Sequence, residues 1–69
     1  MTSPDIWNRI AAEWDAFKGL VRDHWLKLTE DDIAAIAGNR DRLIGRIQAR
    51  YGVGRDEAER EVRDWEMHV

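Results

Sequence analysis

The stretch LTEDDIAAIAGN, residues 28–39, decides the fold, because it contains a helix start, a helix stop and the start of the next helix. Thr29 is a preferred N-cap, acidic residues follow it in the first turn, and Asp32 stands near the second position of a capping box. Gly38 can take the left-handed conformation that ends helices, and Asn39 can cap the helix that follows. The stretch therefore predicts a short helix that ends at Gly38 and a second helix directly after it.

Downstream of this stretch, apolar residues recur with the spacing of one helix face. The core face of the next helix consists of Leu43, Ile44, Ile47 and Tyr51. That helix stops at Gly52, and Gly45 in its middle invites a close neighbour. The last segment begins near Gly54 or Asp56. Its apolar stripe consists of Ala58, Val62 and Trp65.

Upstream of residue 28, the sequence predicts one helix that begins at Ser3-Pro4-Asp5. Serine can cap a helix, proline suits the first helical position, and aspartate favours the positive end of the helix dipole. The apolar residues that share one face of this helix are Trp7, Ile10, Trp14, Phe17 and Val21. Gly19 lies inside the pattern and marks either a bend or a close helix contact.

Length and composition bound the architecture. The chain has 69 residues, which leaves room for one hydrophobic core and so for a single domain over residues 1–69. It has no cysteine, so neither a disulfide nor a thiolate metal site can stabilise it. Its hydrophobic fraction of 43% and charged fraction of 36% fit a folded, water-soluble globule. Since no segment alternates with the period of a strand, we expect an all-α fold of four helices.

Charge and targeting signals bear on location and partners. No apolar run approaches the roughly 18 residues that span a bilayer, and residues 1–5 lack the basic and apolar regions of a signal peptide. We therefore expect a cytoplasmic protein with no membrane partner. The formal net charge of -3 gives no overall attraction to nucleic acid, so any binding of a phosphate backbone has to be local.

Six blocks of the sequence occur in an order that resembles the CsbD-like family of small bacterial proteins. The blocks are WDAFKGLV (14–21), WLKLTEDD (25–32), IAGNRD (36–41), LIGRIQ (43–48), YG (51–52) and DEAE (56–59). Together they extend the resemblance over nearly the whole chain from Trp14 to Glu66. The sequence departs from the family pattern in two ways: Arg46 stands where lysine is usual, and Ile6-Trp7 add apolar bulk near the N-terminus.

The resemblance implies a compact helical domain of bacterial origin that belongs to a general stress-response set, and it implies no known reaction. It also supports a packing that short helices favour, namely two helical hairpins that cross at a steep angle. We therefore expect a compact four-helix domain with a non-enzymatic interaction or protective role. A protein partner is the leading expectation, and weak nucleic-acid binding is the alternative.

Four tryptophans in 69 residues can either build the core or offer a surface that binds cations or stacks on bases. Trp14, Trp25 and Trp65 each fall on an apolar stripe, which favours the core because a small domain needs large side chains to fill its interior. We expect Trp14 at the centre of the core, so that Trp14→Ala leaves the chain largely unfolded. Trp7 stands at a helix start, where burial and exposure both remain open, and Trp7→Ala is expected to keep its helices.

Arg42, Arg46 and Arg50 follow one another at steps of four and form the only basic stripe of the sequence. One interpretation is a solvated face partly paired with acidic residues. The other is a surface that binds RNA, DNA or an acidic protein. We take this stripe, together with Arg55, as the candidate interaction surface.

The turn at Gly52-Val53-Gly54 is a second candidate for nucleic acid. Glycines there let backbone N–H groups at a helix start approach a phosphate, and Arg55 can assist. Asp56 and Glu57 would place two negative charges beside that phosphate. Their more ordinary role is to stabilise the helix N-terminus, so this interpretation is the weaker one.

No residue pattern indicates catalysis, a metal or a cofactor. His24 and His68 are far apart in the sequence and lack a zinc-ligand spacing. Asp31-Asp32, or Glu57 with Glu61, could act as acid and base only in a cleft that shifts a carboxyl pKa, and four short helices rarely form one. A phosphate loop, a nucleophile elbow and a serine-histidine-aspartate arrangement are all missing. We therefore expect no enzyme, no cofactor and no small-molecule substrate.

Overall fold

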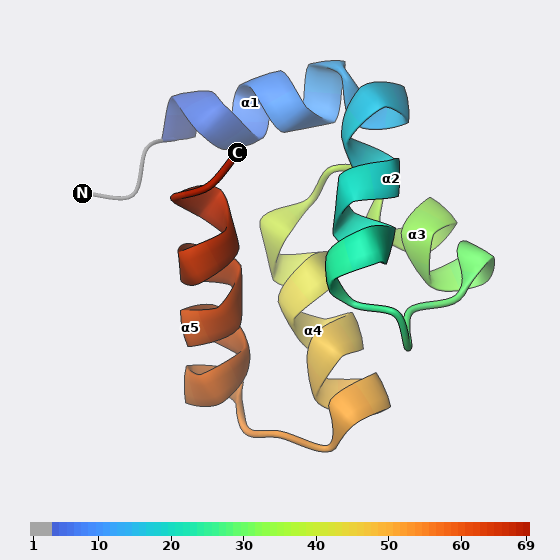
Figure 1. The fold of residues 1–69 in the computed structure, drawn as a ribbon, viewed down its shortest axis with the longest axis vertical. Helices are drawn as coiled ribbons and strands as arrows, with labels where there is room; N and C mark the ends of the chain where they lie inside the picture. Colours follow the sequence, from blue (N-terminus) through green and yellow to red (C-terminus); the bar gives the residue numbers. More distant parts are fainter. Residues whose placement is uncertain (1–3) are drawn as a thin grey trace.

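The computed structural model describes the backbone of residues 4–69 and the side chains of residues 6–69. Over this range it contains five helices and no strand: α1 (Pro4–Ala12), α2 (Trp14–His24), α3 (Glu30–Ile36), α4 (Arg40–Tyr51) and α5 (Arg55–Glu66) (Figure 1). The all-α class is therefore confirmed. None of these helices is long and apolar enough to cross a membrane, as far as the chain is described. The expected cap at Ser3 lies outside the described residues.

The helices are arranged around α4, which packs against both α3 and α5. α4 and α5 run antiparallel side by side, joined by the turn at residues 52–54, and α1 lies across the end of α5 (Figure 1). The expected pair of hairpins is not confirmed, because α3 packs on a helix of this one antiparallel pair while α1 and α2 meet at a corner. The molecule measures 28 × 28 × 17 Å.

The expected count of four helices is wrong, since the first predicted helix breaks at Glu13 into α1 and α2. Glu13 has φ -116° and ψ 38°, outside the helical range. A straight helix over residues 4–24 would be about 32 Å long at roughly 1.5 Å per residue, whereas the largest extent of the molecule is 28 Å. The break turns α1 across the globule, where the ring centroids of Trp7 and Trp65 lie 6.0 Å apart. Periodicity could not predict this break, because the apolar spacing continues through it.

The caps predicted for α3 and α4 are present. Thr29 Oγ1 accepts a hydrogen bond from the backbone N–H of Asp32 at 3.1 Å, and Asp32 Oδ2 accepts one from the backbone N–H of Thr29 at 3.0 Å, which completes the capping box. Asn39 Oδ1 caps α4 by accepting from the backbone N–H of Arg42 at 3.1 Å. α4 ends at Gly52, whose φ is 65°. The start signals of both helices and the stop signal of α4 are thus confirmed, whereas the C-cap of α3 is Ala37, with a left-handed φ of 46°, one residue before the predicted Gly38.

Gly38 is the glycine that the packing requires. Its φ is 79°, and a Cβ atom there would lie 2.6 Å from the Cα of Ala11, because α1 passes close to the turn between α3 and α4. Gly19 and Gly45 differ from expectation, since a Cβ at either position meets no neighbouring atom within 4 Å. α2 and α4 continue through them. Neither a bend nor a close contact therefore explains these two glycines.

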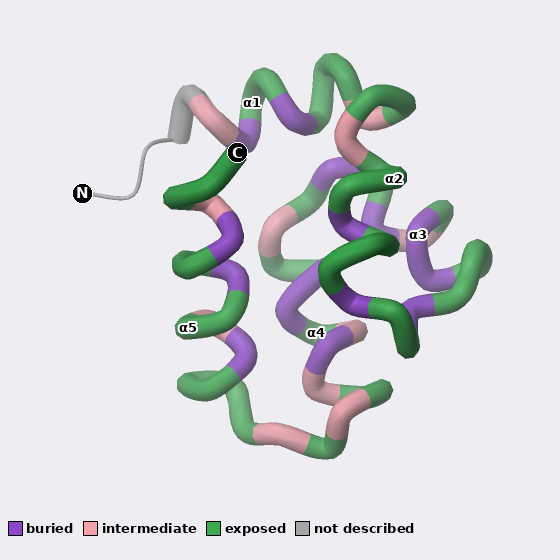
Figure 2. Tube along the Cα trace, viewed as in Figure 1, coloured by how far each residue is buried: buried purple, intermediate pink, exposed green. Residues whose placement is uncertain are grey.

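One core fills the space between the five helices, and Figure 2 shows a buried side on every helix. The buried core residues are Trp7, Ile10, Val21, Trp25, Leu28, Ile33, Ile36, Leu43, Ile44, Ile47, Ala58, Val62 and Trp65. The apolar stripe predicted for α5 is buried throughout, and that of α4 is buried except for Tyr51, which is partly buried. The periodicity therefore identifies the inward faces of α4 and α5.

The tryptophans divide into three buried residues and one partly buried residue. Trp7, Trp25 and Trp65 are 8%, 2% and 4% exposed. Trp14 packs only against the edge of the core, so its expected central position is wrong. The break at Glu13 explains both outcomes: it brings Trp7 onto Trp65, and it leaves Trp14 beside a groove between α2 and α3.

Candidate interaction surface

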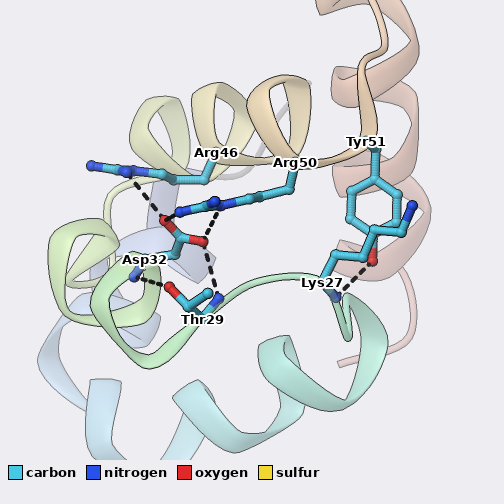
Figure 3. A network of polar contacts seen from close by, with 6 residues as sticks. All are labelled: Lys27, Thr29, Asp32, Arg46, Arg50 and Tyr51. Carbon is cyan, nitrogen blue, oxygen red and sulfur yellow. Dashed lines mark hydrogen bonds and ion pairs between the residues drawn. The ribbon is translucent and has the colours of Figure 1, made fainter.

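A buried carboxylate lies behind the arginine stripe. Asp32 is 0% exposed, and its carboxylate accepts hydrogen bonds on both oxygens (Figure 3). Arg50 donates from Nε to Oδ2 at 2.7 Å and from Nη2 to Oδ1 at 3.0 Å, while Arg46 donates from Nη1 to Oδ1 at 3.1 Å. The backbone N–H of Thr29 donates to Oδ2 at 3.0 Å. The carboxylate is therefore surrounded by donors from α4 and from the cap of α3.

These contacts fix the charge of Asp32. The hydrogen bonds from Arg50 hold the pKa of the Asp32 carboxyl well below its usual range, although burial alone would raise that pKa. The bond from the Thr29 backbone lowers it further. The same pairing with Asp32 raises the pKa of the Arg50 guanidinium. Asp32 is thus an anion at neutral pH with occupied lone pairs, which suits a link between α3 and α4 and does not suit proton transfer.

The arginines along α4 differ in what they bind. Arg46 and Arg50 bind Asp32, and their side chains remain 43% and 42% exposed. Arg42 instead donates from Nη1 to the carbonyl oxygen of Ala35 at 3.2 Å. Within residues 6–69, no carboxylate lies within 4 Å of its guanidinium. Of the three arginines in the stripe, Arg42 is therefore the one that has no ion pair with a carboxylate of residues 6–69.

A groove of about 510 Å³ lies between α3 and α4 beside this stripe. Its lining consists of Ala35, Arg42, Gly45, Arg46 and Ala49. The α4 members are spaced by three, one and three positions, which places them on one face of that helix. The groove therefore has a floor of small residues between two arginines, and no acidic side chain among residues 6–69 lines it.

Arg55 belongs to the glycine turn, where two carboxylates hold it. Its Nη2 donates to Asp41 Oδ1 at 3.1 Å, and its Nε lies 3.7 Å from Glu59 Oε1. Gly54 is the N-cap of α5, which has no side-chain cap hydrogen bond. A phosphate at this helix start would compete with both carboxylates for the one arginine.

The last turn of α4 contacts the loop that precedes α3. Tyr51 Oη accepts a hydrogen bond from the backbone N–H of Lys27 at 3.2 Å (Figure 3). Lys27 Nζ lies 5.1 Å from the centroid of the Tyr51 ring, a cation–π distance. The last turn of α4 is therefore held in place on the same side of the molecule as Asp32 (Figure 3).

Glu66 is a second acidic residue that joins helices, here α1, α4 and α5. Its Oε2 accepts hydrogen bonds from Trp7 Nε1 and from Arg40 Nε, the latter at 2.9 Å. The Glu66 side chain is 11% exposed. Trp65 stands beside it, with its ring centroid 6.0 Å from that of Trp7 and 5.8 Å from that of Trp25. These three tryptophans are therefore part of the hydrophobic core.

Further hollows lie outside the arginine stripe, and two of them are lined by tryptophans or histidines. The one between α2 and α3 has a volume of about 500 Å³ and is lined by Trp14, Asp15, Ala16, Lys18, Gly19, Arg22, Glu30, Ile33 and Ala34. The other, of about 350 Å³, is lined by Leu20, Asp23, His24, Trp65, His68 and Val69. The fold thus brings the two histidines to one hollow, although they lie far apart in the sequence. Over the described residues, no group of three metal-ligating side chains is placed to hold an ion.

Sequence reasoning missed the ion pairs of Asp32 and Glu66. A signal for the first was present: Arg46 and Arg50 flank the buried face of α4, and arginines there need a nearby anion such as a carboxylate in a helix cap. The second had no local signal, because the ion pair of Glu66 with Arg40 joins residues 26 positions apart and depends on the packing of α5 on α4.

The structure defines a class of small all-helical protein in which one buried and one partly buried carboxylate join the helices and open grooves lie between them. The sequence model of the CsbD-like family matches residues 8–60, and the chain belongs to that family. Trp7, Trp65 and Glu66 lie outside the matched range. Their contact therefore lies outside the range that the family model covers.

The curated relatives are bacterial. The UPF0337 protein YjbJ of Escherichia coli K12 is 57% identical over 53 residues, which cover 77% of each chain. A UPF0337 protein of Pectobacterium atrosepticum is 48% identical over 61 residues, or 88% of each chain. YjbJ of Salmonella typhimurium is 55% identical over 53 residues, which cover 77% of this chain and 76% of that one. The names of these relatives state no activity.

Proposed function

We propose that this protein is a non-enzymatic member of a bacterial general stress response and acts in the cytoplasm by contact with other macromolecules, in an interaction or protective role. Membership of the CsbD-like family supports the stress-response part. The non-enzymatic part is supported by one structural observation: the carboxylate of Asp32 is ionised, and both of its oxygens are hydrogen-bonded.

Acid–base catalysis by a carboxyl group needs one that exchanges protons near the working pH and faces a cleft. Asp32, the buried charged residue of the described chain, has the opposite properties. Its oxygens are occupied by Arg46, Arg50 and Thr29, and its pKa is lowered. This buried ion pair therefore serves the fold and leaves the outer faces of the helices for contacts.

Affinity capture of the tagged protein after cross-linking in stressed and unstressed cultures tests the proposal. We expect co-purified macromolecules that increase under stress and are absent from a tag-only control. A protective role without a fixed partner predicts instead that loss of the protein lowers survival under stress. An empty capture together with unchanged survival would reject the proposal, and fractionation of the same cultures tests the location.

Weak nucleic-acid binding is the second candidate, and the alignment of Arg42, Arg46 and Arg50 on the α3 side of α4 favours it. Asp32 already neutralises part of this stripe, which makes the candidate the weaker of the two. Electrophoretic mobility shifts with generic DNA and RNA at low salt test it. A real phosphate contact loses affinity steeply as salt rises. No shift at low salt would remove this candidate.

A further inference from the structure

We propose that the groove between α3 and α4 binds an acidic helical segment of a partner protein, with two carboxylates one helical turn apart that pair with Arg42 and Arg46. This inference rests on the proposed function, because it names the surface and the partner chemistry of an interaction protein. Its support comes from the floor of the groove, its charge and the spacing of its arginines.

The floor of the groove is open because Gly45 has no side chain. A glycine inside a helix is costly compared with alanine, and it is usually kept where a neighbour approaches closely. Within the described chain no such neighbour exists, since a Cβ on Gly45 meets nothing within 4 Å. Ala35 and Ala49 continue the same floor. A helix from outside the chain can therefore approach the backbone of α4 here.

The charge of the groove selects an acidic occupant. Arg42 and Arg46 line it, and no carboxylate does. Arg42 is held on the wall by its bond to the Ala35 carbonyl, which leaves its other N–H donors for a ligand. Arg46 gives Nη1 to Asp32, while its side chain stays 43% exposed. Both guanidinium groups are thus positioned by the fold and still have donors to offer.

The spacing of the arginines favours a helix over a nucleic acid. Arg42 and Arg46 are one turn apart, about 6 Å along the axis of α4, and carboxylates at positions i and i+4 of a helix laid along the groove have the same separation. Such a segment needs only two ion pairs. A nucleic acid brings many phosphates to a chain of net charge -3, and the next arginine, Arg50, is bound twice to Asp32. Long-range repulsion therefore opposes the polyanion more strongly than a short acidic segment with two carboxylates.

The probe is a fluorescein-labelled, alanine-based peptide of about 20 residues, long enough to be helical, with glutamates at positions i and i+4. A second peptide carries glutamines at those positions. Fluorescence anisotropy with the whole protein is measured at salt concentrations of about 20 and 150 mM, which differ strongly in screening. A short duplex DNA forms a third arm. We expect the glutamate peptide to bind, and its Kd to rise about threefold or more at the higher salt, as for exposed ion pairs.

Two pairs of matched variants locate the site. Gly45→Glu fills the floor of the groove and adds a negative charge, and Gly19→Glu makes the same change on α2, where a Cβ also meets nothing within 4 Å. Arg42→Ala removes a lining arginine, and Arg63→Ala removes an exposed arginine of α5. We expect Gly45→Glu to raise the Kd at least tenfold and Arg42→Ala about threefold, while Gly19→Glu and Arg63→Ala change it less than about twofold. Circular dichroism checks that each variant is folded.

Three results would overturn the proposal: equal binding of the glutamate and glutamine peptides, equal losses in the two members of a matched pair, or binding of the duplex DNA without binding of the peptide. The last result would favour nucleic acid as the partner. Comparison of wild type with Gly45→Glu in the capture experiment separates the two proposals. Partners captured equally by both proteins would reject the groove and keep the proposed function, whereas an empty capture with unchanged stress survival would reject the proposed function.

Discussion

Arg50 in the last turn of α4 binds Asp32 in the first turn of α3 through two hydrogen bonds, Nε to Oδ2 at 2.7 Å and Nη2 to Oδ1 at 3.0 Å. This bidentate pair forms at a carboxylate that is 0% exposed and that also completes the capping box of Thr29. α3 has only seven residues, too few to be stable alone. The position of α3 therefore depends on the ion pair between Asp32 and the arginines of α4.

Asp32→Asn is expected to lower the free energy of unfolding by about 2–4 kcal/mol, because the amide nitrogen cannot accept from Arg50 Nε and the Thr29 backbone N–H as Oδ2 does, and the charge of the pair is lost. The loss stays below that of a fully buried pair, since Arg46 and Arg50 are 43% and 42% exposed and can be hydrated. Urea denaturation followed by circular dichroism measures it. Asp31→Asn, on the exposed side of the same turn, should cost less than about 1 kcal/mol. Equal losses in the two variants would contradict the assigned role of Asp32.

The contribution of Asp32 to stability is expected to disappear in acid. Its pKa in the folded protein is held well below the usual range by the hydrogen bonds from Arg50, and the unfolded value is about 3.9. The contribution is therefore complete above about pH 5. As the pH falls below about 4, the unfolded chain binds a proton first and stability is lost. The stability difference between wild type and Asp32→Asn should narrow from pH 7 to about pH 2.5 in urea titrations. A constant difference would show that the pKa of Asp32 is not lowered.

Trp7→Ala is expected to destabilise the protein more than Trp14→Ala, the reverse of what the sequence suggests. Trp7 is 8% exposed, stacks near Trp65 and donates to Glu66, so its loss should cost about 3–5 kcal/mol. Trp14 is partly buried at the edge of the core, and its loss should cost about 1 kcal/mol. Thermal melts by far-ultraviolet circular dichroism give the order. A larger loss for Trp14→Ala would mean that α1 does not pack on α5 in solution.

Local signals were enough for parts of this fold and insufficient for others. Thr29 and Asp32 cap α3 through contacts within one turn, so residue types at fixed spacing could predict them. The break at Glu13 serves a contact between residues 7 and 65, which no local pattern encodes. The arginine stripe was visible as a spacing, but its neutralisation by Asp32 needed the packing of α3 on α4. The groove at Gly45 could not be predicted from the sequence either, because it forms only where α3 packs beside α4.

Gly45→Ala is expected to raise the free energy of unfolding by about 0.5–1 kcal/mol, because alanine is the better helix former and its Cβ meets nothing within 4 Å. Two other glycines should respond in the opposite direction. Gly52→Ala should cost about 1 kcal/mol, since its φ of 65° is left-handed. Gly38→Ala should cost more, because a φ of 79° is combined with a Cβ position 2.6 Å from the Cα of Ala11.

Urea denaturation of the three variants beside wild type should therefore give the order Gly45→Ala, wild type, Gly52→Ala and Gly38→Ala from most to least stable. The order tests the glycine at position 45, since among these three positions only there does the fold lose nothing when a methyl group is added. Under the proposed groove, Gly45 weakens its own helix and leaves room for the approach of a partner. If Gly45→Ala proved less stable than wild type, the packing of α4 itself would need the glycine. The open floor between Arg42 and Arg46 would then be a consequence of folding and not a surface kept for a partner.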